Sequence, residues 1–339
     1  MKKPVFVLLI ILQAGFLYAQ LGGKKSFEFL NLPIGARVAG LGGVIVSTID
    51  GDVNLFMSNP ALLDTSMSQH VSWSHMGYYD GIKYNTFSYV REIGGLGAFG
   101  IGIQHLGYGD IDRYDPAGVG QGTYSAGETA VVLGYSHQVS LFRLGANIKY
   151  VQSTIDSYQS SALLFDLGGT FTHPEKELSM AILFKNLGIV LSDYTSTSSE
   201  ILPTDLQVGV TFKPEHMPFR FTFTGYNLLN FKSVYYDESQ DQGKGEPGAI
   251  DQAFRHVSIG MEIVLGPNFN IRTGYNHMLR QELRLKEKAG MSGISLGFMA
   301  KIKAFEFSYA YSTYHVGGGN SYFTITSNLN RIFYKKSII

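Results

Sequence analysis

The chain has 339 residues, of which only 16% are charged, and its 27 basic and 27 acidic residues balance to a formal net charge of zero. Nucleic-acid binders need a basic face to meet phosphates, so this balance argues against a partner of that class. The absence of cysteine excludes disulfides and cysteine-bound metals, whereas 40 glycines, 21 tyrosines and 23 phenylalanines among few charges are typical of a β-barrel in lipid.

The first 20 residues, MKKPVFVLLIILQAGFLYAQ, have the pattern of an export signal. Two lysines precede an apolar run over residues 5–17, and Ala19 offers a small residue before a cut at Gln20. The run is too short to span a bilayer as a helix, and it has no polar face. The sequence therefore predicts a cleaved signal peptide over residues 1–19.

Residues 20–69 do not alternate, and they are rich in small and apolar residues. Pro33 suits the first turn of a helix over residues 34–41, which Gly42 and Gly43 would end. Asp52 is expected to cap a second short helix that ends near Asn59 and Pro60. We interpret this segment as a helical plug.

The plug would fill a barrel of intermediate width, because eight strands enclose only side chains whereas sixteen leave a channel. Arg37 is the one cation of its first predicted helix, and it would either pair with acidic residues of the lumen or lie solvated at the periplasmic mouth. The candidate plug residues are Arg37, Asp52, Asn54, Asn59 and Pro60.

From residue 70 to residue 339 the sequence alternates with a period of two, as in strands that have one apolar and one polar face. Most segments run for about 10 residues, the length of a tilted membrane strand. The pattern predicts an all-β, transmembrane antiparallel barrel of about fourteen strands. The strands would begin near Val71, Lys83, Leu96, Glu128, Phe142, Ser161, Leu178, Thr204, Phe219, Phe254, Asn268, Ser292, Phe305 and Tyr322.

The predicted connections alternate in length. Those after even-numbered segments are short, whereas long loops are expected over residues 107–121, 189–202, 231–252 and 277–290. Outer-membrane barrels have short periplasmic turns and long extracellular loops, so this parity predicts periplasmic termini in the outer membrane of a Gram-negative bacterium. A soluble sandwich would not be expected to keep the parity.

Charged strand residues are expected to face the lumen, because a lysine or arginine that faces mid-bilayer lipid costs about 2–4 kcal/mol. We interpret them as lumen lining and as partners of the plug, and a transport path is the alternative. They are Lys149, Asp166, Lys185, Asp205, Arg220 and Glu262.

Two strings in the plug carry a family resemblance: FLNLPIGARVAGLGG and DGDVNLFMSNPALL, within residues 29–63. They resemble the PorV/PorQ family of type IX secretion outer-membrane proteins, which are FadL-like barrels. The resemblance implies a fourteen-stranded barrel with an N-terminal plug. It also implies a place in the surface attachment complex, next to PorU and PorV, where the chain would hold a surface partner resembling PorZ.

No catalytic or metal-binding pattern stands out. Asp50-Gly51-Asp52 starts like a calcium loop, but Ala61 stands where the closing glutamate is required. The nine histidines are scattered without HExxH spacing, and Ser136 lies in a GYSHQ string that lacks the last glycine of a nucleophile elbow. We therefore expect no enzyme activity, cofactor or metal.

The sequence is compatible with three candidate functions. The first is an outer-membrane barrel, in contact with lipid, that anchors a PorZ-like partner. The alternative is a FadL-like channel for small hydrophobic molecules, with a pocket between plug and wall and a kinked strand such as residues 96–102. A barrel lipase comes last, because no Ser-His or acid constellation stands out in the sequence.

Overall fold

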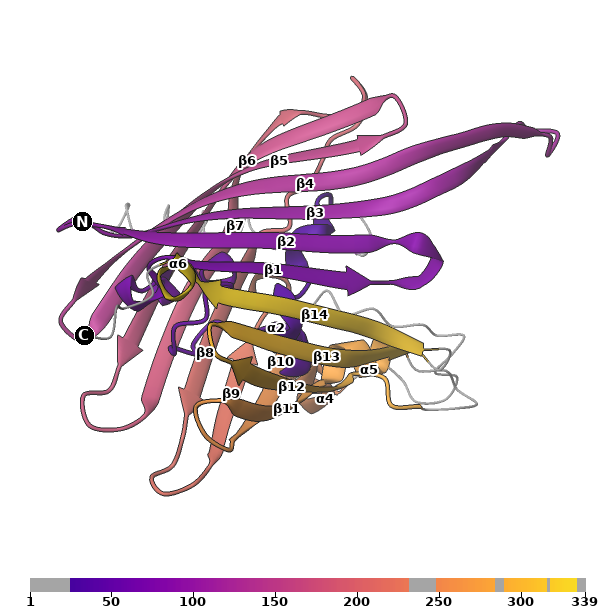
Figure 1. Ribbon diagram of the computed structural model, residues 1–339. Helices are drawn as coiled ribbons and strands as arrows, with labels where there is room; N and C mark the ends of the chain where they lie inside the picture. The colour runs from indigo at the N-terminus through magenta and orange to yellow at the C-terminus, as the bar shows by residue number, and fades with distance from the viewer. Residues whose placement is uncertain (1–24, 232–247, 284–289, 316–317, 334–339) are drawn as a thin grey trace, which may run out of the picture.

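The computed structural model describes residues 25–231, 248–283, 290–315 and 318–333. Fourteen antiparallel strands form a closed barrel in which each strand pairs with its neighbours in sequence and β1 pairs with β14 (Figure 1). The predicted all-β barrel of fourteen strands is therefore confirmed. The predicted signal peptide lies outside the described residues.

The strands differ greatly in length, so one side of the wall is taller than the other. They are β1 (His70–Gly77), β2 (Lys83–Ile93), β3 (Gly97–Tyr114), β4 (Gly120–Val139), β5 (Phe142–Ile155), β6 (Tyr158–Thr172), β7 (Leu178–Ser192), β8 (Asp205–Phe212), β9 (Phe219–Gly225), β10 (Val257–Val264), β11 (Phe269–Asn276), β12 (Ile294–Ile302), β13 (Phe305–His315) and β14 (Gly318–Asn328).

The exterior of the barrel is apolar and its interior is polar or small. Leu133, Ile148 and Trp73 are 54%, 49% and 44% exposed, while inward-facing Gln104 and Asn147 are buried. This is the reverse of a soluble barrel, and it follows from the alternation in the sequence. Among the described residues, no helix combines the length and the apolar character needed to cross a membrane.

Two predicted boundaries are wrong. The loop expected over residues 107–121 is mostly strand, because β3 continues to Tyr114 and β4 begins at Gly120. The last strand begins at Gly318 rather than near Tyr322, and it ends at Asn328, where α6 (Leu329–Phe333) follows it. In Figure 1, the β3–β4 hairpin extends well past the neighbouring strands.

The connections define two ends of the barrel. The short-turn end carries the connections after β2, β4, β6, β8, β10 and β12, and the long-loop end carries the others. The long-loop end also holds η4 (Tyr79–Gly81), η5 (Leu228–Asn230), α4 (Ala249–Arg255) and α5 (His277–Leu283). The expected loops over residues 231–252 and 277–290 thus contain helices, and residues 232–247 and 284–289 lie outside the described part.

The N-terminal segment lies inside the barrel and crosses it (Figure 1). Helix α2 packs against β11 to β14 and β1, whereas η2 packs against β4, β5 and β6 on the other side. The segment consists of η1 (Glu28–Asn31), α2 (Gly35–Gly40), α3 (Leu55–Ser58), η2 (Pro60–Leu62) and η3 (Thr65–Met67).

Glycines of the wall lie where the plug comes closest. A Cβ atom at Gly274 would lie 2.1 Å from the Gly42 nitrogen, and one at Gly145 would lie 2.3 Å from the Pro60 carbonyl carbon. Only a residue without a side chain permits such an approach of two backbones. These strand glycines therefore fix the position of the plug against the wall.

Candidate functional site

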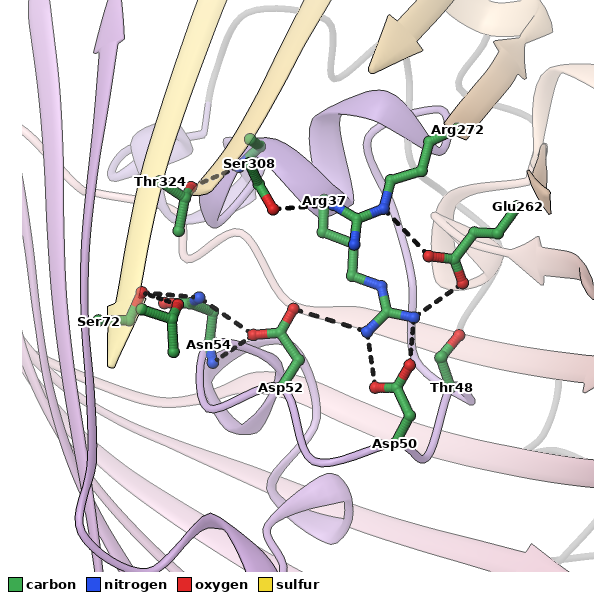
Figure 2. Close-up of polar contacts among 12 residues, drawn as sticks. Arg37, Thr48, Asp50, Asp52, Asn54, Ser72, Glu262, Arg272, Ser308 and Thr324 are labelled. Atoms are coloured by element: carbon green, nitrogen blue, oxygen red, sulfur yellow. Dashed lines mark hydrogen bonds and ion pairs between the residues drawn. The ribbon is translucent and has the colours of Figure 1, made fainter. Parts of the chain in front are cut away.

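A cluster of ions, buried at Arg37, Glu262 and Arg272 and partly exposed at Asp50, joins the plug to the wall (Figure 2). Arg37 of α2 donates from Nη1 to Asp50 Oδ1 at 2.6 Å and from Nη2 to Asp50 Oδ2, which is a bidentate pair within the plug. The same Nη2 donates to Glu262 Oε2 of β10 at 2.7 Å. Of the two positions considered for Arg37, the structure has the one paired with acidic residues in the lumen.

Two further arginines of the wall complete the cluster. Arg272 of β11 donates from Nε to Glu262 Oε1 at 3.1 Å and from Nη1 to Ser308 Oγ at 3.2 Å. Arg220 of β9 donates from Nη1 to Asp50 Oδ2 at 2.8 Å and to Glu262 Oε2 at 3.0 Å. Breaking a buried pair leaves an uncompensated charge, so this cluster holds the plug in one place.

Two acidic plug residues, Asp50 and Asp64, are held in their ionised form. Burial by itself raises the pKa of Asp50, but the charge and hydrogen bonds of Arg37, together with the charge of Arg220, bring that pKa well below its ordinary value. Burial likewise opposes the lowered pKa of Asp64, which the backbone N–H of Ser66 and the Arg143 guanidinium produce. Both carboxylates therefore stay charged at neutral pH.

The predicted plug residues fall into two groups. Asp52 Oδ2 lies 3.7 Å from Arg37 Nη1, and Asn54 donates to Asp52 Oδ1 at 3.1 Å and to Ser72 Oγ of β1 at 3.0 Å. Asp52 also accepts from the Asn54 N–H at 3.0 Å, which closes the turn before α3 instead of capping that helix. Arg37, Asp52 and Asn54 therefore belong to one network of polar contacts.

Asn59 and Pro60 lie apart from the ion cluster, at the start of η2. Asn59 donates from Nδ2 to the Val46 carbonyl oxygen at 2.8 Å and accepts from the Ala61 N–H at 3.0 Å. Pro60 occupies the first position of η2, where its missing N–H costs nothing. Their role is to shape the plug backbone.

A second set of charges lies in the wall and faces the lumen. Lys149 Nζ is 2.6 Å from Asp166 Oδ2, and both side chains are buried. Lys185 of β7 donates instead to the plug, to the Leu30 carbonyl oxygen at 2.9 Å and to Asn31 Oδ1 at 3.2 Å. It forms no ion pair among the described residues, so its charge is held by neutral oxygens of the plug.

A cavity of about 360 Å³ lies between the plug and the wall. Leu32, Ile34 and Val44 of the plug and Leu279 of α5 give it apolar sides. Its polar lining includes Lys185, Asp205, Gln207 and Asn276. Asp205 Oδ2 accepts from Gln207 Nε2 at 2.7 Å and from the Asn227 N–H at 2.9 Å. The cavity thus combines an apolar surface with a few fixed polar groups, as sites for small molecules do.

The chemistry considered from the sequence finds no support in this geometry. Ser136 is buried, and its Oγ donates to the Leu63 carbonyl oxygen of the plug at 2.6 Å, so it serves as a plug contact. Within residues 25–231, 248–283, 290–315 and 318–333, no three acidic or histidine side chains lie close enough to hold a metal ion.

Sequence reasoning missed Arg272, and it noted Asp50 only as part of a failed calcium loop. Arg272 is 2% exposed, and it lies on the inward face of β11 together with Asn270 and Gly274. The alternation of this strand could have identified it as a lumen residue. The pairing of Arg37 with Glu262, 225 positions later, has no local signal.

Comparison of the sequence with protein-family models finds no match, and none is found among curated proteins. A FadL homologue from Pseudomonas aeruginosa is a structural match at 10% identity and a TM-score of 0.45, over 87% of this chain and 98% of that chain. The KdgM porin, solved in complex with disordered oligogalacturonate, matches at 8% identity and a TM-score of 0.34, over 76% and 98%. A mutant of the Rh. blastica porin matches at 10% identity and a TM-score of 0.33, over 76% and 98%. At these values the likeness concerns the fold alone, and what this chain binds has to follow from its own residues.

Proposed function

We propose that the chain is an outer-membrane β-barrel that takes small hydrophobic molecules into the cavity between its plug and its wall. The observation that carries this proposal is the cavity itself. Its volume of about 360 Å³ lies within the range of about 300–1,000 Å³ that is usual for small-molecule sites. It lies in the lumen, between residues of the plug and residues of the wall.

The apolar exterior supports the membrane location. Leu133, Ile148 and Tyr150 are exposed on strands whose inward side chains are polar or small. Such a band has no favourable surroundings in water, whereas bilayer hydrocarbon matches it. The short-turn end and the termini would face the periplasm, and the long-loop end would face the cell exterior.

Lys185 connects the cavity to the first residues of the plug. Lys185 lines it and at the same time holds the Leu30 carbonyl oxygen and Asn31 at the start of the plug. A hydrophobic ligand with a polar end group at this end of the cavity would compete for the donors of Lys185. Occupation of the cavity would thereby loosen the first plug residues, which is what passage through the barrel requires.

A substitution that fills the cavity tests this function. Val44→Trp adds an indole to the cavity lining and is expected to weaken binding of the hydrophobic fluorophore 1-N-phenylnaphthylamine by at least about tenfold, since most of the ligand surface would lose its contacts. Val119→Trp, at the exposed tip of the β3–β4 hairpin, is the control and should bind like the wild type. Equal affinity of all three proteins, or no binding by the wild type, would contradict the proposal.

A second candidate function is the anchoring of a surface protein. The observation that favours it is the β3–β4 hairpin, which passes the last β2 pair at Gly107 and the last β5 pair at Ala126. Tyr114 and Val119 near its tip are 63% and 58% exposed. The family resemblance implies a PorZ-like partner, with PorU and PorV in the same complex.

The lack of native cysteine makes this second function directly testable. A photo-crosslinker on Val119→Cys should capture one large surface protein in intact cells, whereas the same label on Leu265→Cys, at the short-turn end, should not. Capture of nothing at Val119→Cys, or of the same proteins at both positions, would rule out anchoring through this hairpin.

A further inference from the structure

A row of polar side chains crosses six neighbouring strands on the outside of the barrel. The register of β1 to β6 places its members directly opposite one another: His75, Asn85, His105, Thr129, Gln152 and Ser161. Two residues closer to the short-turn end, the same strands carry an apolar row of Trp73, Phe87, Ile103, Val131, Tyr150 and Leu163. The outward surface therefore changes from apolar to polar within two residues along each strand.

Such a change, with aromatic residues at its border, is what a barrel presents where hydrocarbon ends and lipid headgroups begin. Because the change lies toward the long-loop end, the polar row faces the headgroups of the outer leaflet. This assignment rests on the proposed membrane location, and it does not depend on what the inner cavity binds.

The polar row contains a hollow of about 410 Å³ on the outer face of β3, β4 and β5. It forms beside the opposed glycines Gly107 and Gly127, which leave no side chain on the wall. The imidazole of His105 lies over them: a Cβ atom at Gly107 would be 3.6 Å from His105 Nε2. The other ring nitrogen, Nδ1, is 2.9 Å from Thr129 Oγ1. Nε2 has no hydrogen-bond partner among the described residues.

The side chains that line the hollow indicate which class of ligand it can bind. The polar side chains of the lining are hydroxyls, an amide and one imidazole: Ser125, Thr129, Thr154, Gln152 and His105, and Ala126 and Gly127 complete it. Lys83, opposite Gly107, is the nearest cation in the register and does not line the hollow. Neutral donors and acceptors of this kind suit sugar hydroxyls better than a phosphate, which requires cationic or amide donors.

We infer that this hollow binds the sugar headgroup of a glycolipid of the outer leaflet, whose acyl chains lie along the apolar row below. Ile103 and Val131 continue from His105 and Thr129 toward the short-turn end, so one lipid molecule spans both rows. A soluble sugar would gain nothing from that apolar surface. The barrel exterior therefore carries a lipid site that is separate from its lumen.

The test is retention of a defined glycolipid by the purified chain, measured by native mass spectrometry after titration with a rough-type lipopolysaccharide. The double variant His105→Leu/Gln152→Leu removes two hydrogen-bonding groups from a lipid-facing surface, where leucine is well tolerated, and retention should fall by at least about tenfold. Thr313→Leu, on the outward face of β13 toward the same end, is the control and should retain lipopolysaccharide like the wild type.

A second variant, Gly127→Leu, places a side chain on a glycine that lines the hollow and leaves every hydrogen-bonding side chain in place, and it should also release the glycolipid. A heat-shift gel shows that each barrel is folded. Equal retention of lipopolysaccharide by the wild type and both variants would overturn the inference. So would equal retention of phosphatidylglycerol and lipopolysaccharide by the wild type, because the headgroup phosphate rather than the sugar would then be recognised.

Discussion

Arg37 is the residue on which the plug depends most. It is the plug cation of the ion cluster and is itself buried, and without it Asp50 and Glu262 would pair only with the two arginines of the wall, Arg220 and Arg272. For Arg37→Met we expect the plug to lose about 3 kcal/mol of stability, and hydrogen exchange over residues 53–63 to become about 100-fold faster.

The matched control is Arg113→Met, because Arg113 also pairs with a carboxylate, Asp156, but at an exposed site on the hairpin. Surface pairs contribute at most about 1 kcal/mol, so exchange in the plug should stay within a few-fold of the wild type. Unchanged plug exchange in Arg37→Met would show that the cluster does not hold the segment in place.

Asp50 sets the dependence of the plug on pH. Its pKa in the folded protein is lowered below the ordinary value of 3.8, so its stabilising effect is complete above that value and is lost as the pH falls through the lower, folded pKa. The wild-type barrel should therefore stay closed, with no ion conductance in a planar bilayer, from pH 8 to pH 4. Opening between pH 7 and pH 5 would contradict this assignment, because no loss of the Asp50 charge occurs there.

Among the elements, β11 comes very close to the backbone of the plug at Gly274. A methyl group at Gly274 would meet the Gly42 nitrogen at 2.1 Å and the Leu41 carbonyl carbon at 2.4 Å. Gly274→Ala should therefore push the plug away at a cost of about 1–3 kcal/mol and expose the peptide bond after Arg37 to trypsin.

Gly169→Ala is the control for this prediction. Gly169 is also a strand glycine, but a Cβ atom there would meet nothing closer than 3.6 Å. The control should resist trypsin like the wild type. Cleavage at the same rate in both variants would mean that strand glycine itself, rather than the contact with the plug, determines protection.

Alternation predicted the strands well wherever one face meets an apolar environment. Phe219, Phe221 and Phe223 alternate with polar residues in β9 because the barrel separates two surroundings there. Beyond the barrel both faces of the β3–β4 hairpin meet water and the alternation disappears, which is why the sequence predicts a loop over residues 107–121 where the structure has strands. Strand ends outside the apolar band are therefore not determined by periodicity.

The candidate site was less predictable than the fold. Arg37, Asp52 and Asn54 could be identified because polar residues are rare in an apolar plug segment. Their partners could not, because the contact between Arg37 and Glu262 arises only when the barrel closes around the plug. A site built from long-range pairs follows from the closed fold and not from a local motif.

The molecule as a whole is expected to be a membrane-spanning barrel that its own N-terminal segment closes. The decisive measurement is ion conductance in a planar bilayer, with the wild type compared to a variant that lacks residues 27–64 and still shows the heat shift of a folded barrel. The wild type should be silent and the deletion variant should form stable pores, because a fourteen-stranded barrel is too wide for its own side chains to fill. Steady pores in the wild type, or silence in both proteins, would contradict the claim.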